Sequence, residues 1–150
     1  MTIRTVHHPF AIAAPGKALN ITLWTLQVLV ALAFVAAAAG KLLGSADMIA
    51  LFDAVGVGQW FRYVTGLLEL LGALLLIVPG RAAFGSVLLA GVMAGAVVAH
   101  LTVLHTAPTA PLVLLALTAL ISWGRCSPLV SLVAAHVRVK DAETANMLQR

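Results

Sequence analysis

The sequence predicts an all-α fold, a polytopic membrane four-helix bundle with a short interfacial helix in the first outer loop. Two observations lead to this prediction. Of the 150 residues, 62% are hydrophobic and only 9% are charged, whereas soluble domains have about 25% charged residues. The apolar residues also gather in four segments that proline, glycine and polar residues separate. A chain this apolar needs lipid as its solvent.

The first and third apolar segments reach the roughly 20 residues that a bilayer-crossing helix needs. The second does so if Glu69 is tolerated within it, and the fourth is short for a span. The first segment exceeds the roughly 7 to 15 residues of a signal-peptide core, so we expect it to remain as a span. The four-helix region is residues 21–124, with expected spans at 21–40, 61–78, 82–104 and 110–124.

The positions of the basic residues predict the orientation, because Lys and Arg are retained on the cytoplasmic side. Lys41 and Arg62 lie between the first two spans, on one side of the membrane, and the other seven lie on the side of both tails. We therefore expect the tails, residues 1–20 and 125–150, to be cytoplasmic. Because the basic residues are scattered along the flanks of apolar runs, the sequence does not predict nucleic-acid binding. The seven residues are Arg4, Lys17, Arg81, Arg125, Arg138, Lys140 and Arg150.

The first outer loop has its own helical pattern. Ser45 is a suitable N-cap residue, and the apolar residues after it recur at helical spacing. The helix would lie in the membrane interface, beside a local aromatic belt. Its predicted face is Met48, Leu51, Phe52 and Val55, and the belt is Trp60, Phe61 and Tyr63. Residues 128–140 have the composition of a second interfacial helix, on the inner side.

Glu69 is the most informative residue of the second span. It lies nine residues beyond Trp60, which at about 1.5 Å per residue places it roughly 13 Å deep in the membrane. An ionisable group there costs about 3 kcal/mol and is expected to face the bundle interior. Small residues one turn away, Gly66 and Gly72 among them, favour close helix contact on that face.

Three further polar residues fall in the outer half of the bundle, above Glu69. Lys41 ends the first span, Arg62 begins the second, and His100 lies near the outer end of the third. Each also has a structural interpretation: Lys41 and Arg62 as interfacial cations whose stems lie along the span, and His100 as a neutral hydrogen-bonded residue. Glu69 itself is open to interpretation as a protonated packing residue. If Glu69 is charged, Lys41 is its expected partner.

The sequence does not predict metal or thiol chemistry. Its histidines lack metal-ligand spacing, and the single cysteine, Cys126, excludes an internal disulfide or a CxxC pair. Gly91 and Gly95 form a GxxxG pattern that is typical of a helix-packing seam.

Three short motifs resemble the DoxX-like family. They are Gly40-Lys41-Leu42, Gly66-Leu-Leu-Glu69-Leu-Leu-Gly72 and Gly95-Ala-Val-Val-Ala-His100, and the resemblance covers about Leu23 to Trp123. It implies a small four-span protein of the bacterial inner membrane. Some relatives are subunits of quinone-linked sulfur oxidoreductases, and others assemble with redox-defence enzymes at the membrane. Members that use paired cysteines differ from this chain, which has only Cys126.

The leading hypothesis is a membrane subunit that binds a small lipophilic molecule, a quinone being the expected class, and supports a redox system through a membrane or peripheral partner protein. Lys41 or His100 would donate to a quinone carbonyl, with Arg62 beside them. Trp60 and Tyr63 would flank the ring, and Glu69 would relay protons as the catalytic group. Because no flavin or dinucleotide motif is present, the chain is not expected to be an oxidoreductase on its own.

Two other classes stay open at this point. Glu69 suits a small proton-coupled transporter, although Lys41 and Arg62 would repel a cation that approaches from outside. The chain also fits a structural anchor that holds a partner enzyme at the membrane.

Overall fold

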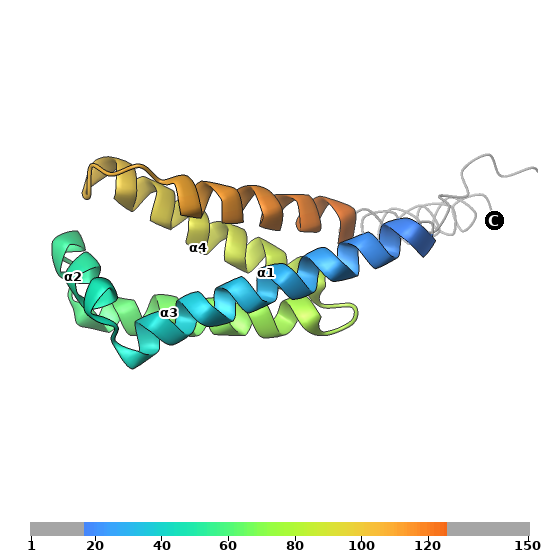
Figure 1. Cartoon of the computed structure of the whole chain (residues 1–150), viewed down its shortest axis with the longest axis horizontal. Helices are drawn as coiled ribbons and strands as arrows, with labels where there is room; N and C mark the ends of the chain where they lie inside the picture. The colour runs from blue at the N-terminus through green and yellow to red at the C-terminus, as the bar shows by residue number, and fades with distance from the viewer. Residues whose placement is uncertain (1–16, 126–150) are drawn as a thin grey trace, which may run out of the picture.

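The structure is a computed structural model that describes residues 17–125. Four long helices form an elongated bundle, and a short helix crosses one end of it (Figure 1). The all-α four-helix bundle with a short helix in its first loop, predicted from the sequence, is therefore confirmed. The helices are α1 (Lys17–Leu43), α2 (Ala46–Val55), α3 (Gln59–Ile77), α4 (Ala82–Thr102) and an unlabelled last helix, Thr109–Arg125.

The chain runs up and down the bundle. The start of α1, the α3–α4 turn and the end of the last helix lie together at the end opposite α2 (Figure 1). We call this the α3–α4 end, and we call the other the α2 end. Most of the predicted N-terminal tail, and the interfacial helix predicted for 128–140, lie outside the described residues.

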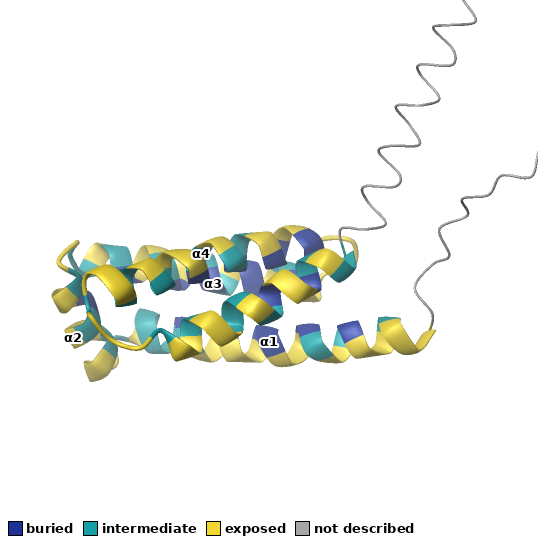
Figure 2. Cartoon of the chain, turned by 90° about the horizontal axis from the view of Figure 1, so that it is seen from above, coloured by how far each residue is buried: buried dark blue, intermediate teal, exposed yellow. Residues whose placement is uncertain are grey.

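Three of the helices, α1, α3 and α4, are long and apolar enough to cross a membrane, with 27, 19 and 21 residues. Each expected span coincides with a helix to within a few residues. The last helix, Thr109–Arg125, is shorter and also apolar. The outward-facing sides of the helices are exposed along the bundle (Figure 2). They carry large apolar side chains such as Leu29, Leu67 and Val98. Such a surface is stable in lipid and not in water.

The interior of the bundle is built from all four long helices. Phe34 of α1, Leu76 of α3, Leu89 of α4 and Ile121 of the last helix are fully buried in one cluster. Around it, α1 packs mainly on α3, and α3 packs on α4.

Two glycines allow the close approach of α3 and α4. A Cβ atom on Gly85 would lie 2.7 Å from both the carbonyl oxygen of Gly72 and the nitrogen of Leu76, and one on Gly72 would lie 2.5 Å from Leu89 Cγ. This is the small-residue packing that membrane helices use. Gly91 does not have its expected role in a packing seam. It is exposed, and within the described residues a Cβ added to it would meet no atom of another helix within 4 Å.

Helix α2 has the apolar face that the sequence predicts. Phe52 is buried and packs edge-to-face on Phe61, with ring centroids 6.0 Å apart. Ser45 occupies the N-cap position, but its hydroxyl makes no capping hydrogen bond. Gly56 ends the helix with φ of 77°, a left-handed conformation that favours glycine. The chain then turns into α3 after only three residues, which keeps α2 at this end of the bundle (Figure 1).

Candidate functional site

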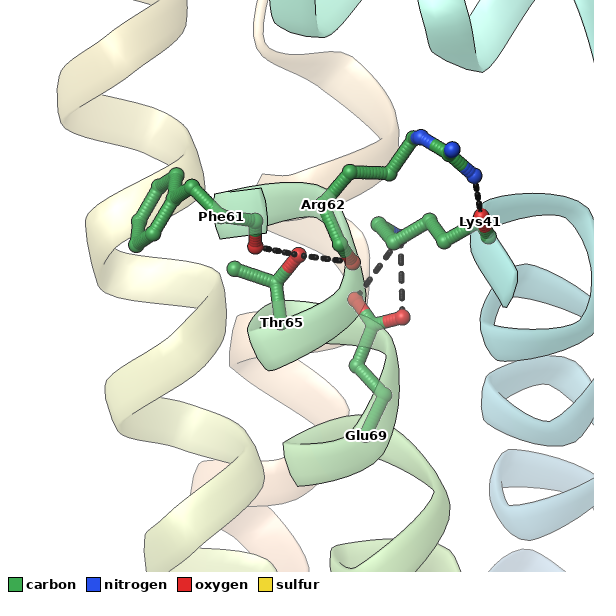
Figure 3. A network of polar contacts seen from close by, with 5 residues as sticks. All are labelled: Lys41, Phe61, Arg62, Thr65 and Glu69. Carbon is green, nitrogen blue, oxygen red and sulfur yellow. Dashed lines mark hydrogen bonds and ion pairs between the residues drawn. The ribbon is translucent and has the colours of Figure 1, made fainter. Parts of the chain in front are cut away.

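A buried ion pair joins α1 to α3 near the α2 end (Figure 3). The ammonium nitrogen of Lys41 lies 2.9 Å from Oε1 and 2.8 Å from Oε2 of Glu69, so it donates to both carboxylate oxygens. Glu69 is only 1% exposed, and the Lys41 side chain is 15% exposed. The pairing of Lys41 with Glu69 that the sequence predicts is therefore present.

The backbone of α3 is shaped to receive Lys41. Gly66 lies one turn before Glu69 and faces the end of α1, where an added Cβ would come within 3.2 Å of Lys41 Cβ and 3.1 Å of Leu42 Cγ. The absence of a side chain at Gly66 lets the stem of Lys41 pass over α3 and reach the carboxylate below. The small-residue face around Glu69 thus has a direct role in the geometry.

Arg62 lies above the ion pair and holds the end of α1. Its Nη1 group donates to the carbonyl oxygen of Lys41, and its Nε group donates to Oε1 of Gln59 at 2.7 Å. The guanidinium carbon stands 4.4 Å from the centre of the Tyr63 ring, a cation–π geometry. Arg62 is 4% exposed. Arg62 is therefore a buried residue and not an interfacial cation, which was the alternative that the sequence left open.

A chain of polar contacts continues from Arg62 to the surface. The Nε2 group of Gln59 donates to Oδ1 of Asp53 at 2.7 Å and to the carbonyl oxygen of Ile49 at 2.9 Å. Asp53 is exposed on α2. Hydrogen bonds therefore join the exposed face of α2 to Arg62 of α3 and to the backbone of α1 at Lys41. The ammonium group of the same Lys41 pairs with Glu69.

The one cation that contacts the Glu69 carboxylate in the described residues is Lys41. Arg62 is a second cation, bonded to the Lys41 carbonyl oxygen, and Thr65 on the same helix donates to the backbone oxygens of Phe61 and Arg62 (Figure 3). A cation that approached Glu69 would therefore meet Lys41, which already occupies both carboxylate oxygens.

The other sequence-predicted site residues lie apart from the pair or point outward. His100 has its Nδ1 atom 2.8 Å from the hydroxyl of Thr106, in the loop after α4. Trp60 is exposed and packs edge-to-face on Phe61, with centroids 5.8 Å apart. Tyr63 is also exposed, and the face of its ring lies against Arg62. The structure thus brings together Lys41, Arg62, Tyr63 and Glu69, while the contacts of His100 are with Thr106.

Sequence reasoning missed several polar contacts. Gln59 and Asp53 received no role, although a glutamine at the start of a span, six residues after an acid, was a usable signal. Arg125 was interpreted only as a topogenic charge. It is half-buried at the end of the last helix and donates from Nε to Oε1 of Gln27 at 2.7 Å. Gln27, buried in the middle of an apolar run, was the signal for that second polar cluster.

The apolar helices and the buried polar groups that link them define an integral membrane protein. The model of the DoxX-like family matches residues 25–122. The chain belongs to the DoxX-like family, as the sequence motifs predict. No curated protein and no solved structure gives a significant match.

Proposed function

We propose that this DoxX-like protein is a membrane subunit that binds a small lipophilic molecule of the quinone class at the α2 end and exchanges protons with it through Glu69. The observation that carries the proposal is the ion pair between Lys41 and the almost fully buried Glu69. Leucine at this position would insert more favourably by about 3 kcal/mol. A passive helix contact therefore has no need for a glutamate.

The chemistry of the pair fits reduction or oxidation of a quinone. A quinone carbonyl accepts hydrogen bonds and gains protons as it is reduced, so its site needs a donor and a proton source. The Lys41 ammonium is a donor, and the Glu69 carboxylate, after it takes up a proton from water, would pass that proton to the reduced quinone oxygen. Electrons would come from a redox partner protein, which is the supporting role that this proposal gives the subunit.

The charges around Glu69 favour this function over a cation transporter. A cationic substrate would have to displace Lys41 from both carboxylate oxygens and would meet Arg62 on the way. A carbonyl or reduced-quinone oxygen would instead be attracted to these cations. The Lys41 side chain is partly exposed at the α2 end, so this proposal has protons reach the pair from that end.

Binding is the direct test of the proposal. We expect protein purified in mild detergent from quinone-containing membranes to retain quinone, which extraction and chromatography would identify. After lipid stripping, added quinone should bind with a saturable isotherm. Lys41→Met should abolish this binding, whereas Lys17→Met, which removes an exposed lysine from the other end of α1, should leave it unchanged. Equal binding by wild type and Lys41→Met would refute the proposal.

A further inference from the structure

A second polar cluster lies at the α3–α4 end of the bundle, far along α1 from the Lys41–Glu69 pair. Arg125, the last residue of its helix, donates from Nε to Oε1 of Gln27 at 2.7 Å and from Nη1 to Oδ1 of Asn20 at 2.9 Å. Its guanidinium carbon is 5.5 Å from the centre of the Trp24 ring. Gln27, which is fully buried, donates in turn to the carbonyl oxygen of Leu76 at 2.6 Å. These contacts fix the guanidinium in place.

One corner of this guanidinium is left without a partner. Within residues 17–125, Arg125 Nη2 is the only buried side-chain nitrogen or oxygen that has no hydrogen-bond partner. All the groups that hold Arg125 are neutral, and the only ion pair in the described part of the chain is Lys41–Glu69. A buried charged donor without an acceptor is costly. The site therefore has a positive charge and a hydrogen-bond donor to offer to a ligand.

A cavity of about 260 Å³ adjoins this cluster. Drug-sized ligands occupy pockets of about 300 to 1,000 Å³, so this cavity suits a small group or one part of a larger molecule. Its wall combines the Arg125 guanidinium with the α3–α4 turn and the start of α4. Its lining includes Trp24, Gln27, Gly80, Ala82, Ala83 and Arg125.

The start of α4 adds a second source of positive potential to the same cavity. No side chain caps this helix of 21 residues, and Ala82 and Ala83 of its first turn line the cavity. The first backbone N–H groups of a helix lack partners within the helix, and the helix dipole places positive potential there. An oxyanion in the cavity would therefore meet both the fixed guanidinium and the α4 N-terminus.

We propose that this cavity binds a phosphate group and that the phosphate belongs to an anionic phospholipid. The α3–α4 end is where the spanning helices α1, α3 and α4 reach the membrane surface, so lipid headgroups lie at the height of Arg125. Arginine matches phosphate geometry through paired N–H groups, and Nη2 is the group that remains free for it. The exposed Arg81 next to the cavity adds to the attraction for anionic lipid. This inference does not depend on the function proposed for the α2 end.

Thermal unfolding of the full chain, stripped of lipid in detergent, tests the proposal in two arms. One arm adds phosphatidylglycerol and compares it with phosphatidylcholine, and the other adds inorganic phosphate without lipid. We expect a saturable rise in Tm with phosphatidylglycerol and a smaller one, or none, with phosphatidylcholine. A rise with inorganic phosphate alone would support the cavity as a phosphate site and would assign it to the free ion. No rise in either arm would overturn the proposal.

Variants locate the binding. Arg125→Lys keeps the charge but removes the Nη2 group, so we expect the apparent affinity for phosphatidylglycerol to fall by about tenfold, a common consequence of losing a charge-assisted hydrogen bond. Arg81→Gln is the matched control, since it removes an exposed arginine at the same end. It should change the affinity much less. An equal loss in both variants would indicate general surface attraction and would contradict a site at Arg125. If Arg125→Lys does not fold, native mass spectrometry of wild type decides: no retained anionic lipid or phosphate overturns the proposal.

Discussion

Lys41 and Glu69 form an ion pair in which one ammonium group donates to both carboxylate oxygens, at 2.9 and 2.8 Å, across the contact of α1 with α3. The two partners differ in their access to solvent. Glu69 is 1% exposed, whereas the Lys41 side chain is 15% exposed. An unpaired lysine has a route to water that an unpaired glutamate lacks, and the mutational response of the pair should therefore be asymmetric.

A double-mutant cycle in detergent measures this asymmetry. We expect Lys41→Met to lower the free energy of unfolding by about 3 kcal/mol or more, since it leaves a buried carboxylate without its cation. Glu69→Gln should cost less, because the lysine can turn toward the surface. The double variant should recover part of the loss. Strictly additive losses would show that the two side chains do not stabilise each other.

The packing of α3 on α4 gives a second prediction with an internal control. Gly85→Ala should destabilise the protein by roughly 2 kcal/mol, because the new methyl group would meet backbone atoms of Gly72 and Leu76 at 2.7 Å and the helices would have to separate. Gly91→Ala, on an exposed face of the same helix, should be neutral. Thermal unfolding in one detergent compares them. Equal stability of the two variants would contradict the close approach of these helices.

Arg62 provides a third prediction, on the difference between arginine and lysine. Arg62→Lys should fail to restore wild-type stability, because a single ammonium group cannot contact Gln59, the Lys41 carbonyl oxygen and the Tyr63 ring in the same fixed geometry. We expect both Arg62→Lys and Arg62→Gln to lower the free energy of unfolding, by about 1 to 3 kcal/mol. Full stability with lysine would mean that only the charge of Arg62 matters.

The orientation in the membrane is a fourth prediction. The excess of basic residues on the side of both tails predicts that the tails are cytoplasmic, with α2 on the outer side. A reporter fused after Arg150 should therefore give a cytoplasmic signal, and one inserted at Gly56, in the loop after α2, should give an external signal. Signals on the same side would contradict four spans, most directly at the 17-residue last helix.

The elements that the sequence predicted best are those that periodicity and hydropathy control. The apolar runs became α1, α3, α4 and the last helix, and the spacing of Met48, Leu51, Phe52 and Val55 identified the inward face of α2. Helical spacing also placed Gly66 and Glu69 on one face. In each case the local pattern and the packing in the bundle favour the same structure.

Contacts between distant parts of the chain were harder to predict. Depth in the membrane grouped His100 with Lys41 and Arg62, but depth does not define the direction in which a side chain points around its helix, and His100 contacts Thr106 instead. Arg125 was counted as a charge beyond the last span. Its contacts with Asn20 and Gln27 join residues about a hundred positions apart, which no local pattern of a single sequence encodes.

The central claim is that Glu69 belongs to a ligand site and not only to a helix contact. Labelling with a hydrophobic carbodiimide, which reacts with carboxyl groups inside membranes, tests this claim most directly in lipid-stripped protein with and without added quinone. We expect labelling of wild type at Glu69, none at this position in Glu69→Gln, increased labelling in Lys41→Met, and protection of wild type by quinone at saturating concentration. Labelling of Glu69 that quinone leaves unchanged, at concentrations that fill the membrane phase, would contradict the claim.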